Sequence, residues 1–408
     1  MATAEGWRRF RPYGRLAPLA VGIVVFGLGE ELWSRYLPEY LRFLGASALA
    51  VGAFGALQDF LDAAYAYPGG WLSDRLGSRR ALLLFGLATA LGFGLYLLSR
   101  SVAGIFLGVL LVVAWKSLGL PATFAMIGEE LSGSRRIVGF TVQSVLKRLP
   151  IALAPPLGGL LLERFGMAGG MRTGFLVSIA LSIAMLAGLG LAFRRSSPPL
   201  PPGEGRGEGA TGVTHTSRSQ LHPTLKRLLV ADVLIRLCEG LPDIFLVVWA
   251  LEILHLSPSQ FGLATSVLMA TAILSYFPAA VLAGRIEKKP FVVATFACFA
   301  LFPLAVVFSR SFRGLLGAYV IGGLREIGEP ARKALIVDLA PPRARGKAVG
   351  LYYAIRGFSV AGAAAIGGAL WTIRPQLTFF AAAVLGTAGT LWAVFALPAR
   401  PAAAEGAR

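Results

Sequence analysis

Apolar runs of about 20 residues recur along almost the whole chain of 408 residues, and each run is long enough to cross a bilayer as an α-helix. The composition agrees with this pattern, because 56% of the residues are hydrophobic and 15% are charged. The mean hydropathy is +0.68. These values exclude a soluble domain and predict an all-α membrane protein with twelve transmembrane helices.

The predicted spans form two sets of six. The first set covers residues 16–37, 47–71, 80–98, 103–126, 137–162 and 174–193, and the second covers 228–252, 260–283, 290–308, 314–338, 347–371 and 377–397. The segment between the sets is rich in Pro, Gly, Ser and Thr, so it cannot bury a core. We therefore expect a cytoplasmic N-terminal segment (1–15), a six-helix bundle (16–195), a flexible cytoplasmic linker (196–225), a second six-helix bundle (226–397) and a cytoplasmic tail (398–408).

The net charge of +18 comes largely from short segments between the spans, so it does not indicate a nucleic-acid partner. With the N-terminus inside, the inner segments carry 23 Lys and Arg residues and the outer segments carry 7. Positive charge on the cytoplasmic side is typical of membrane proteins. We expect a multi-pass protein of the plasma (inner) membrane with both termini in the cytoplasm.

The two sets of spans carry a weak internal repeat. A shift of 209 or 210 residues aligns similar residues in both sets: Gly52 with Gly262, Pro68 with Pro278, Lys116 with Arg325, Pro121 with Pro330, and Lys147 with Arg356. Repeated helical bundles are the architecture of many secondary transporters, whose substrate sites lie between the repeats near the middle of the membrane. The repeat therefore predicts two pseudo-symmetric bundles and a transport function.

Residues 70–82 form a charged turn between the second and third predicted spans, Gly-Trp-Leu-Ser-Asp-Arg-Leu-Gly-Ser-Arg-Arg-Ala-Leu. The turn resembles the loop G-x-L-a-D-R-x-G-R-R-x-x-L of the major facilitator superfamily, although Ser78 replaces a basic residue. The resemblance implies the major facilitator fold and a cytoplasmic gate. The expected gate residues are Gly70, Asp74, Arg75, Gly77, Arg79, Arg80, Glu129, Glu130 and Asp338. We expect Asp74 and Arg75 to form a latch with Glu129 or Glu130 and with nearby basic residues.

The fifth predicted span ends with Ala154-Pro155-Pro156-Leu157-Gly158-Gly159. This segment resembles the G-P-x-x-G-G element of drug:proton antiporters, with Ala154 at the first glycine, and the resemblance implies export. The residues also have a simpler explanation, because proline kinks a helix and small residues allow close helix packing.

Acidic residues within the spans are the candidates for proton coupling. A charge that faces lipid costs at least about 2.5–3.5 kcal/mol, so charged spans are expected to line a wet cavity and charge-free spans to lie outside them. In the seventh span, Asp232, Arg236, Glu239 and Asp243 share one helical face. A carboxyl group in such a cavity can load and release a proton, or it can simply pair with a base. The candidates are Glu30, Glu31, Asp59, Asp62, Glu239 and Asp243.

Basic residues within the spans, and two further acids, are the candidates for the substrate cavity. This set comprises Arg35, Lys116, Lys147, Arg148, Arg236, Arg325, Glu326, Glu329 and Arg356. Antiporters of the superfamily often have an arginine in the middle of the fourth helix, where Lys116 stands in a poorly matching sequence. The cations either hold an anionic or zwitterionic substrate or balance the nearby acids, and the sequence leaves both interpretations open.

Three functions remain open at this point. The first is a proton-coupled secondary transporter that works by alternating access and exports small amphipathic molecules as an antiporter. The second is an importer or exchanger of organic anions or zwitterions, and the third is a membrane sensor that does not transport. No enzyme, cofactor or metal site is expected, because no nucleophile–base pair, ligand cluster or phosphate-binding loop is visible. The expected partners are a small-molecule substrate, a proton or other coupling ion, and the lipid bilayer, with the chain acting as a monomer.

Overall fold

A computed structural model describes residues 2–119, 123, 134–195, 223–282, 288–339 and 345–398. All regular elements within these ranges are helices, which confirms the all-α prediction. Six of the described helices are long and apolar enough to cross a membrane, and Val102–Ser117 and Phe312–Leu324 are shorter apolar helices. The predicted linker (196–225) and tail (398–408) lie almost entirely outside the described residues.

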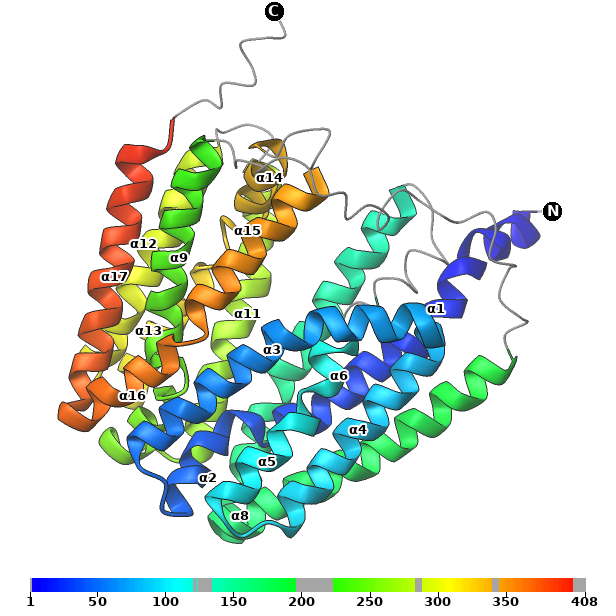
Figure 1. The fold of residues 1–408 in the computed structure, drawn as a ribbon, viewed down its shortest axis with the longest axis horizontal. Helices are drawn as coiled ribbons and strands as arrows, with labels where there is room; N and C mark the ends of the chain where they lie inside the picture. The colour runs from blue at the N-terminus through cyan, green and yellow to red at the C-terminus, as the bar shows by residue number, and fades with distance from the viewer. Residues whose placement is uncertain are drawn as a thin grey trace, which may run out of the picture. The chain divides into compact units, whose positions relative to one another are not determined.

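The chain divides into two compact units. Unit 1 contains Met1–Gly45, Phe60–Arg206 and Ser257–Gly262, and unit 2 contains Ala46–Asp59, Gly207–Leu256 and Leu263–Arg408. Figure 1 labels the helices and colours the chain from blue at the N-terminus to red at the C-terminus.

The helices before the linker follow the first six predicted spans closely. They are α1 (Ala2–Glu31), the 3-10 helix η1 (Ser34–Tyr36), α2 (Leu37–Phe43), α3 (Ala48–Leu76), α4 (Ser78–Leu98), α5 (Val102–Val112), α6 (Ala114–Ser117) and α8 (Ser134–Arg195). The long α8 contains both the fifth and the sixth predicted spans, with a non-helical residue at Gly166 between them.

The helices after the linker follow the second six spans. They are α9 (Pro223–Asp243), α10 (Leu246–Val248), the π-helix η2 (Trp249–Ile253), α11 (Pro258–Leu282), α12 (Lys288–Phe308), α13 (Phe312–Leu324), α14 (Glu329–Leu339), α15 (Arg345–Val360), α16 (Ala363–Ile373) and α17 (Pro375–Ala396).

The first, fourth, seventh, tenth and eleventh predicted spans are interrupted helices. The first four of these breaks lie beside charged residues: after Glu31, before Lys116, after Asp243 and at Arg325. A break within a membrane leaves backbone N–H and C=O groups that need other partners. Interrupted helices in transporters commonly surround the binding site.

Two threonines on neighbouring helices satisfy backbone groups at two of the breaks. In unit 1, the Thr89 hydroxyl on α4 accepts a hydrogen bond from the Trp115 backbone N–H at 2.8 Å. In unit 2, the Thr295 hydroxyl on α12 accepts one from the Gly328 N–H at 2.7 Å. A side chain at Gly328 would overlap the Phe291 carbonyl oxygen, so this position requires glycine. The two repeats therefore stabilise their breaks in the same way.

In unit 1, close backbone contacts surround the Pro155–Gly159 segment. A methyl group at Gly158 would overlap the carbonyl oxygen of Leu32, and one at Gly159 would lie 2.5 Å from the carbonyl of Pro258. The fully buried Tyr36 hydroxyl lies 2.6 Å from the Pro155 carbonyl oxygen and 2.8 Å from that of Pro258, and it can donate its single proton to either. These contacts confirm that the small residues permit tight helix packing.

In unit 2, the charge-free α17 packs against α9 and α12 (Figure 1). The core between these helices is apolar and includes Leu228, Ile235, Phe296 and Ala393. Because α17 supplies no charged side chain, the charged face of α9 is directed toward other helices of the unit.

Glu163 lies between the fifth and sixth predicted spans, outside both, and caps the start of α11. Its Oε1 atom accepts a hydrogen bond from the Ser259 backbone N–H at 3.0 Å. Hydrogen bonds from Ser259 and Ser257 lower the pKa of Glu163 below its ordinary value of 4.5. A carboxyl group with a lowered pKa stabilises the folded state above pH 4.5, and this contribution is lost as the pH falls through the folded-state pKa.

We therefore predict that Glu163→Gln lowers the thermal unfolding temperature of the purified protein at pH 7. The difference from the wild type should shrink as the pH falls below 4.5, because the wild-type carboxylate then loses its charge. Unfolding curves of both proteins across this pH range test the prediction. A difference that stays constant at every pH would contradict it.

Candidate functional site

The charged residues of the predicted spans gather into two clusters, one in each unit. We call the group in unit 1 the Lys116 cluster; it contains Glu30, Asp62, Lys116, Ser117 and Lys147. We call the group in unit 2 the Arg332 cluster; it contains Asp232, Arg236, Glu239, Arg325, Glu329, Arg332 and Arg356. Within the described ranges, no group of three or more His, Cys, Asp or Glu residues could hold a metal ion.

The Lys116 cluster is centred on an ion pair beside the break between α5 and α6. The Lys116 Nζ atom lies 3.5 Å from Oδ2 of Asp62 on α3, and the two side chains are 62% and 38% exposed. The Ser117 hydroxyl donates a hydrogen bond to the other oxygen of Asp62. Charged groups this exposed in the middle of apolar spans need water rather than lipid around them. The pair therefore marks a wet surface of unit 1.

Glu30 lies in the last turn of α1 and is half-buried. Lys116, Glu31 and Asp62 are close enough to act on its charge. Nevertheless, its carboxylate accepts no hydrogen bond and forms no ion pair with any described side chain. The adjacent Glu31 differs, because its carboxylate lies 3.2 Å from Nε of Arg35, four residues further along the chain.

Lys147 on α8 is the second charged residue of this cluster that forms no ion pair within the described part of the chain. Its side chain is exposed, and it lies within electrostatic range of Lys116, Glu30 and Asp62. The neighbouring Arg148 is half-buried on α8, and Asp59 is half-buried on α3, one turn before Asp62.

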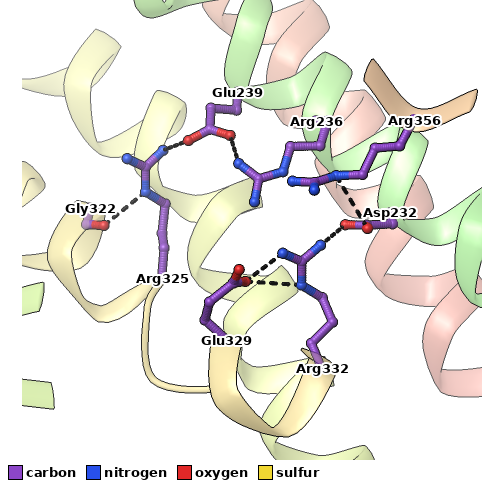
Figure 2. Close-up of polar contacts among 8 residues, drawn as sticks. All are labelled: Asp232, Arg236, Glu239, Gly322, Arg325, Glu329, Arg332 and Arg356. Carbon is purple, nitrogen blue, oxygen red and sulfur yellow. Dashed lines mark hydrogen bonds and ion pairs between the residues drawn. The ribbon is translucent and has the colours of Figure 1, made fainter. Parts of the chain in front are cut away.

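The Arg332 cluster surrounds a buried arginine on α14 (Figure 2). Arg332 is 2% exposed and donates hydrogen bonds to Asp232, which is fully buried on α9, and to Glu329. Asp232 also accepts a hydrogen bond from the Tyr352 hydroxyl at 2.9 Å. The Arg356 Nε atom lies 3.3 Å from Oδ2 of Asp232. The Asp232 carboxylate thus has three partners from two other helices, α14 and α15.

Glu239 forms the other end of the cluster. Its carboxylate accepts a hydrogen bond from Arg236, one turn away on α9, and lies 3.7 Å from Nη1 of Arg325. The Arg325 guanidinium also donates to the Gly322 carbonyl at 2.8 Å and stacks against Phe299, 4.8 Å from the ring centre. Two arginines hold Glu239 in its charged form, so its geometry is that of a structural counter-ion.

The sequence prediction missed the most buried charges of this cluster. Asp232 lies on the charged face of the seventh span but is not among the predicted site residues, and Arg332 is not among them either. The spacing contained the signal, because Arg325, Glu329 and Arg332 follow the i, i+4, i+7 rule on the tenth span. Two other candidates lie at helix ends: Asp243 is exposed at the end of α9, and Glu326 is half-buried between α13 and α14.

The gate residues are only partly described. Gly77 has a φ of +80°, a left-handed conformation that favours glycine, and it ends the turn before α4. Asp74 and Arg75 are exposed, and the Arg75 guanidinium lies 4.2 Å from the ring centre of Trp71. Gly70 and Arg79 are half-buried and Arg80 is exposed. Glu129, Glu130 and the Asp338 side chain lie outside the described residues, so the latch stays a prediction.

We predict that Arg332→Met destabilises the protein by about 3–5 kcal/mol, because it leaves the buried Asp232 without its main counter-ion. The double variant Asp232→Leu/Arg332→Met should recover part of this loss, since it removes both buried charges. Thermal or denaturant unfolding of the purified variants measures the effect. The exposed Arg313→Gln serves as the control, and an Arg332→Met variant as stable as this control would contradict the prediction.

The comparisons with known proteins agree with this architecture. The family model of the Major Facilitator Superfamily matches residues 19–238 and 228–408. An uncharacterized MFS-type transporter of Methanocaldococcus jannaschii is 21% identical over 375 residues, which cover 90% of this chain and 91% of the relative.

Solved structures show the same fold at low identity. A POT family transporter in complex with 5-aminolevulinic acid aligns with a TM-score of 0.74 and 16% identity, covering 94% of this chain and 95% of that chain. A bacterial homolog of the human lysosomal transporter Spinster aligns with a TM-score of 0.67 and 14% identity, covering 95% of each chain. The nucleoside transporter NupG aligns with a TM-score of 0.71 and 12% identity, covering 92% of this chain and 98% of that chain. The chain belongs to the major facilitator superfamily, and it is an integral membrane transporter with the fold of that family.

Proposed function

We propose that this transporter is coupled to protons, works by alternating access and exports small amphipathic molecules. The observation that carries the proposal is the Glu30 carboxylate, which has no counter-ion among the described side chains although it lies on a membrane-spanning helix. Because no base fixes it in the charged form, a proton can neutralise it at a small difference in free energy. Glu239, by contrast, is held by two arginines.

Lys116 connects the protonation of Glu30 to Asp62 on α3, because its ammonium interacts with both acids. When Glu30 carries a proton, the Lys116 ammonium stays with Asp62, as its 3.5 Å separation from Oδ2 indicates. When Glu30 loses its proton, it competes with Asp62 for the same ammonium, which acts on it already. Proton release therefore weakens the link between α3 and α6. A proton that changes the balance between two arrangements of helices is the requirement for coupled transport.

The direction of transport is proposed from the Pro155–Gly159 segment. Its resemblance to the element of drug:proton antiporters supports export, and its two glycines make the close backbone contacts that such an element needs. We also propose that the protein acts as a monomer in the plasma (inner) membrane with both termini in the cytoplasm. The excess of Lys and Arg in the predicted inner segments supports this orientation.

We predict that Glu30→Gln abolishes pH-driven accumulation but leaves exchange of substrate across the membrane. The protein is reconstituted into vesicles and tested with ethidium, tetraphenylphosphonium and benzoate, with and without a pH gradient. For exchange of one proton per substrate, each unit of pH difference supplies about 1.4 kcal/mol, which corresponds to a tenfold concentration ratio. The wild type should approach this ratio, and Glu30→Gln should reach no gradient.

Two control variants are measured in the same transport experiment. Glu30→Asp keeps an ionisable group and should retain part of the coupling, and Glu252→Gln removes an acid that belongs to neither cluster and should behave as the wild type. If Glu30→Gln still accumulates substrate against its gradient, Glu30 is not the coupling residue. If the wild type transports nothing in the presence of a gradient, the membrane-sensor function becomes the better explanation.

A further inference from the structure

The Arg332 cluster contains more positive than negative charge. Its four arginines face three acids, so one positive charge has no counterpart within the cluster. Charges at membrane depth are stable only when they are paired or solvated, and an uncompensated one is expensive. The excess therefore indicates a place where the protein receives an anion from outside the chain.

The excess charge is localised at Arg356 and Arg236. Arg356 donates no hydrogen bond to any described group. Its one ion pair with a described side chain is the 3.3 Å approach of Nε to Asp232. That carboxylate is already occupied, because Arg332 and Tyr352 both donate to it. Arg236 donates one hydrogen bond, to Glu239. The Nε atoms of both arginines are buried without a hydrogen-bond acceptor.

The two guanidiniums are also close to each other. They come from α9 and α15, which pack together, and the positive charge of Arg236 acts directly on Arg356 (Figure 2). Their side chains are 22% and 15% exposed, so a ligand group can reach them from solvent. Two like charges in this position repel each other unless an anion lies between them.

The chemistry of the pair selects a carboxylate. A guanidinium presents its N–H donors in a planar fork that matches the two oxygens of a carboxylate. The ring of Tyr353 lies 5.4 Å from the Arg356 guanidinium, and Phe299 lies 5.6 Å from that of Arg236, so apolar surface adjoins the charged pair. We propose that Arg236 and Arg356 bind the carboxylate of a small amphipathic organic acid, with the aromatic rings contacting its apolar part.

Assigning this acid as the transported molecule rests on the proposed transport function, whereas the binding itself does not. The site would complete the Arg332 cluster: the incoming carboxylate supplies the missing negative charge and accepts the unused N–H donors. This predicts an occupant with a single carboxylate, because the cluster lacks one negative charge.

The test measures thermal stabilisation of the purified full-length protein in detergent. The probes are benzoate, octanoate and succinate, compared with benzamide, benzylamine and sodium chloride at equal ionic strength. At least one monocarboxylate should raise the unfolding temperature, and the neutral and cationic analogues should not. Arg356→Gln should weaken the apparent affinity by about tenfold or more, as expected for loss of charge-assisted hydrogen bonds.

Three further variants make the result decisive. Arg356→Lys keeps the charge but loses the fork, so its affinity should lie between those of the wild type and Arg356→Gln. Arg236→Gln should repeat the loss if Arg356→Gln does not fold. The exposed Arg313→Gln should bind as the wild type does. Equal stabilisation of every variant, equal stabilisation by chloride, or no stabilisation of the wild type by either monocarboxylate, benzoate or octanoate, would overturn the proposal.

The same proteins in vesicles separate the two proposals. If benzoate or octanoate binds through Arg356 but no pH-driven flux is found, the carboxylate site stands and the transport proposal fails. If pH-driven flux is found and Arg356→Gln changes neither its affinity nor its rate, the transport proposal stands and the assignment of the bound carboxylate as the transported molecule fails.

Discussion

The need to compensate charge in an apolar environment shapes this protein more than any other constraint. A fully buried carboxylate such as Asp232 is stable only because Arg332, Arg356 and Tyr352 surround it. Those partners come from helices far apart in the sequence, so the pairing fixes how α9, α14 and α15 pack. The charge-free α17 is not subject to this constraint, and it exposes large apolar side chains such as Val384 and Phe395.

The two units meet this constraint in different ways. The cluster in unit 2 uses arginines, which do not release their protons under biological conditions, so its charges are fixed. The cluster in unit 1 uses lysines and contains an acid, Glu30, that no described base neutralises. The two repeats thus differ, because one contains a cluster of paired arginines and acids and the other contains an acid, Glu30, with no counter-ion among the described side chains. This division supports a proton-dependent step in the first half and a binding step in the second.

The fold was largely predictable from sequence because membrane spans have a strong signal: the length and composition of apolar runs. The breaks within the spans were not, because a helix break such as that at Val113 depends on Thr89, which lies on another helix. The charged residues were identified by type, but their pairing was not. Glu30 and Glu239 are both acids within predicted spans, but Glu239 is paired with Arg236, three residues earlier, and with Arg325, which lies 86 residues further along the chain. The pairing of Arg332 was not predictable either, because its partner Asp232 lies 100 residues earlier in the chain.

The threonines beside the helix breaks have a mechanical consequence. Thr89 and Thr295 each hold an interrupted helix at its break, through a hydrogen bond to the backbone. A helix that is bonded to its neighbour at one point cannot slide easily along that neighbour, but the segments on either side of that point can tilt in opposite senses. Each threonine is therefore a fixed point about which the interrupted helix can tilt. A small displacement of the charged residues on one side of the break then produces a larger movement at the far end of the helix.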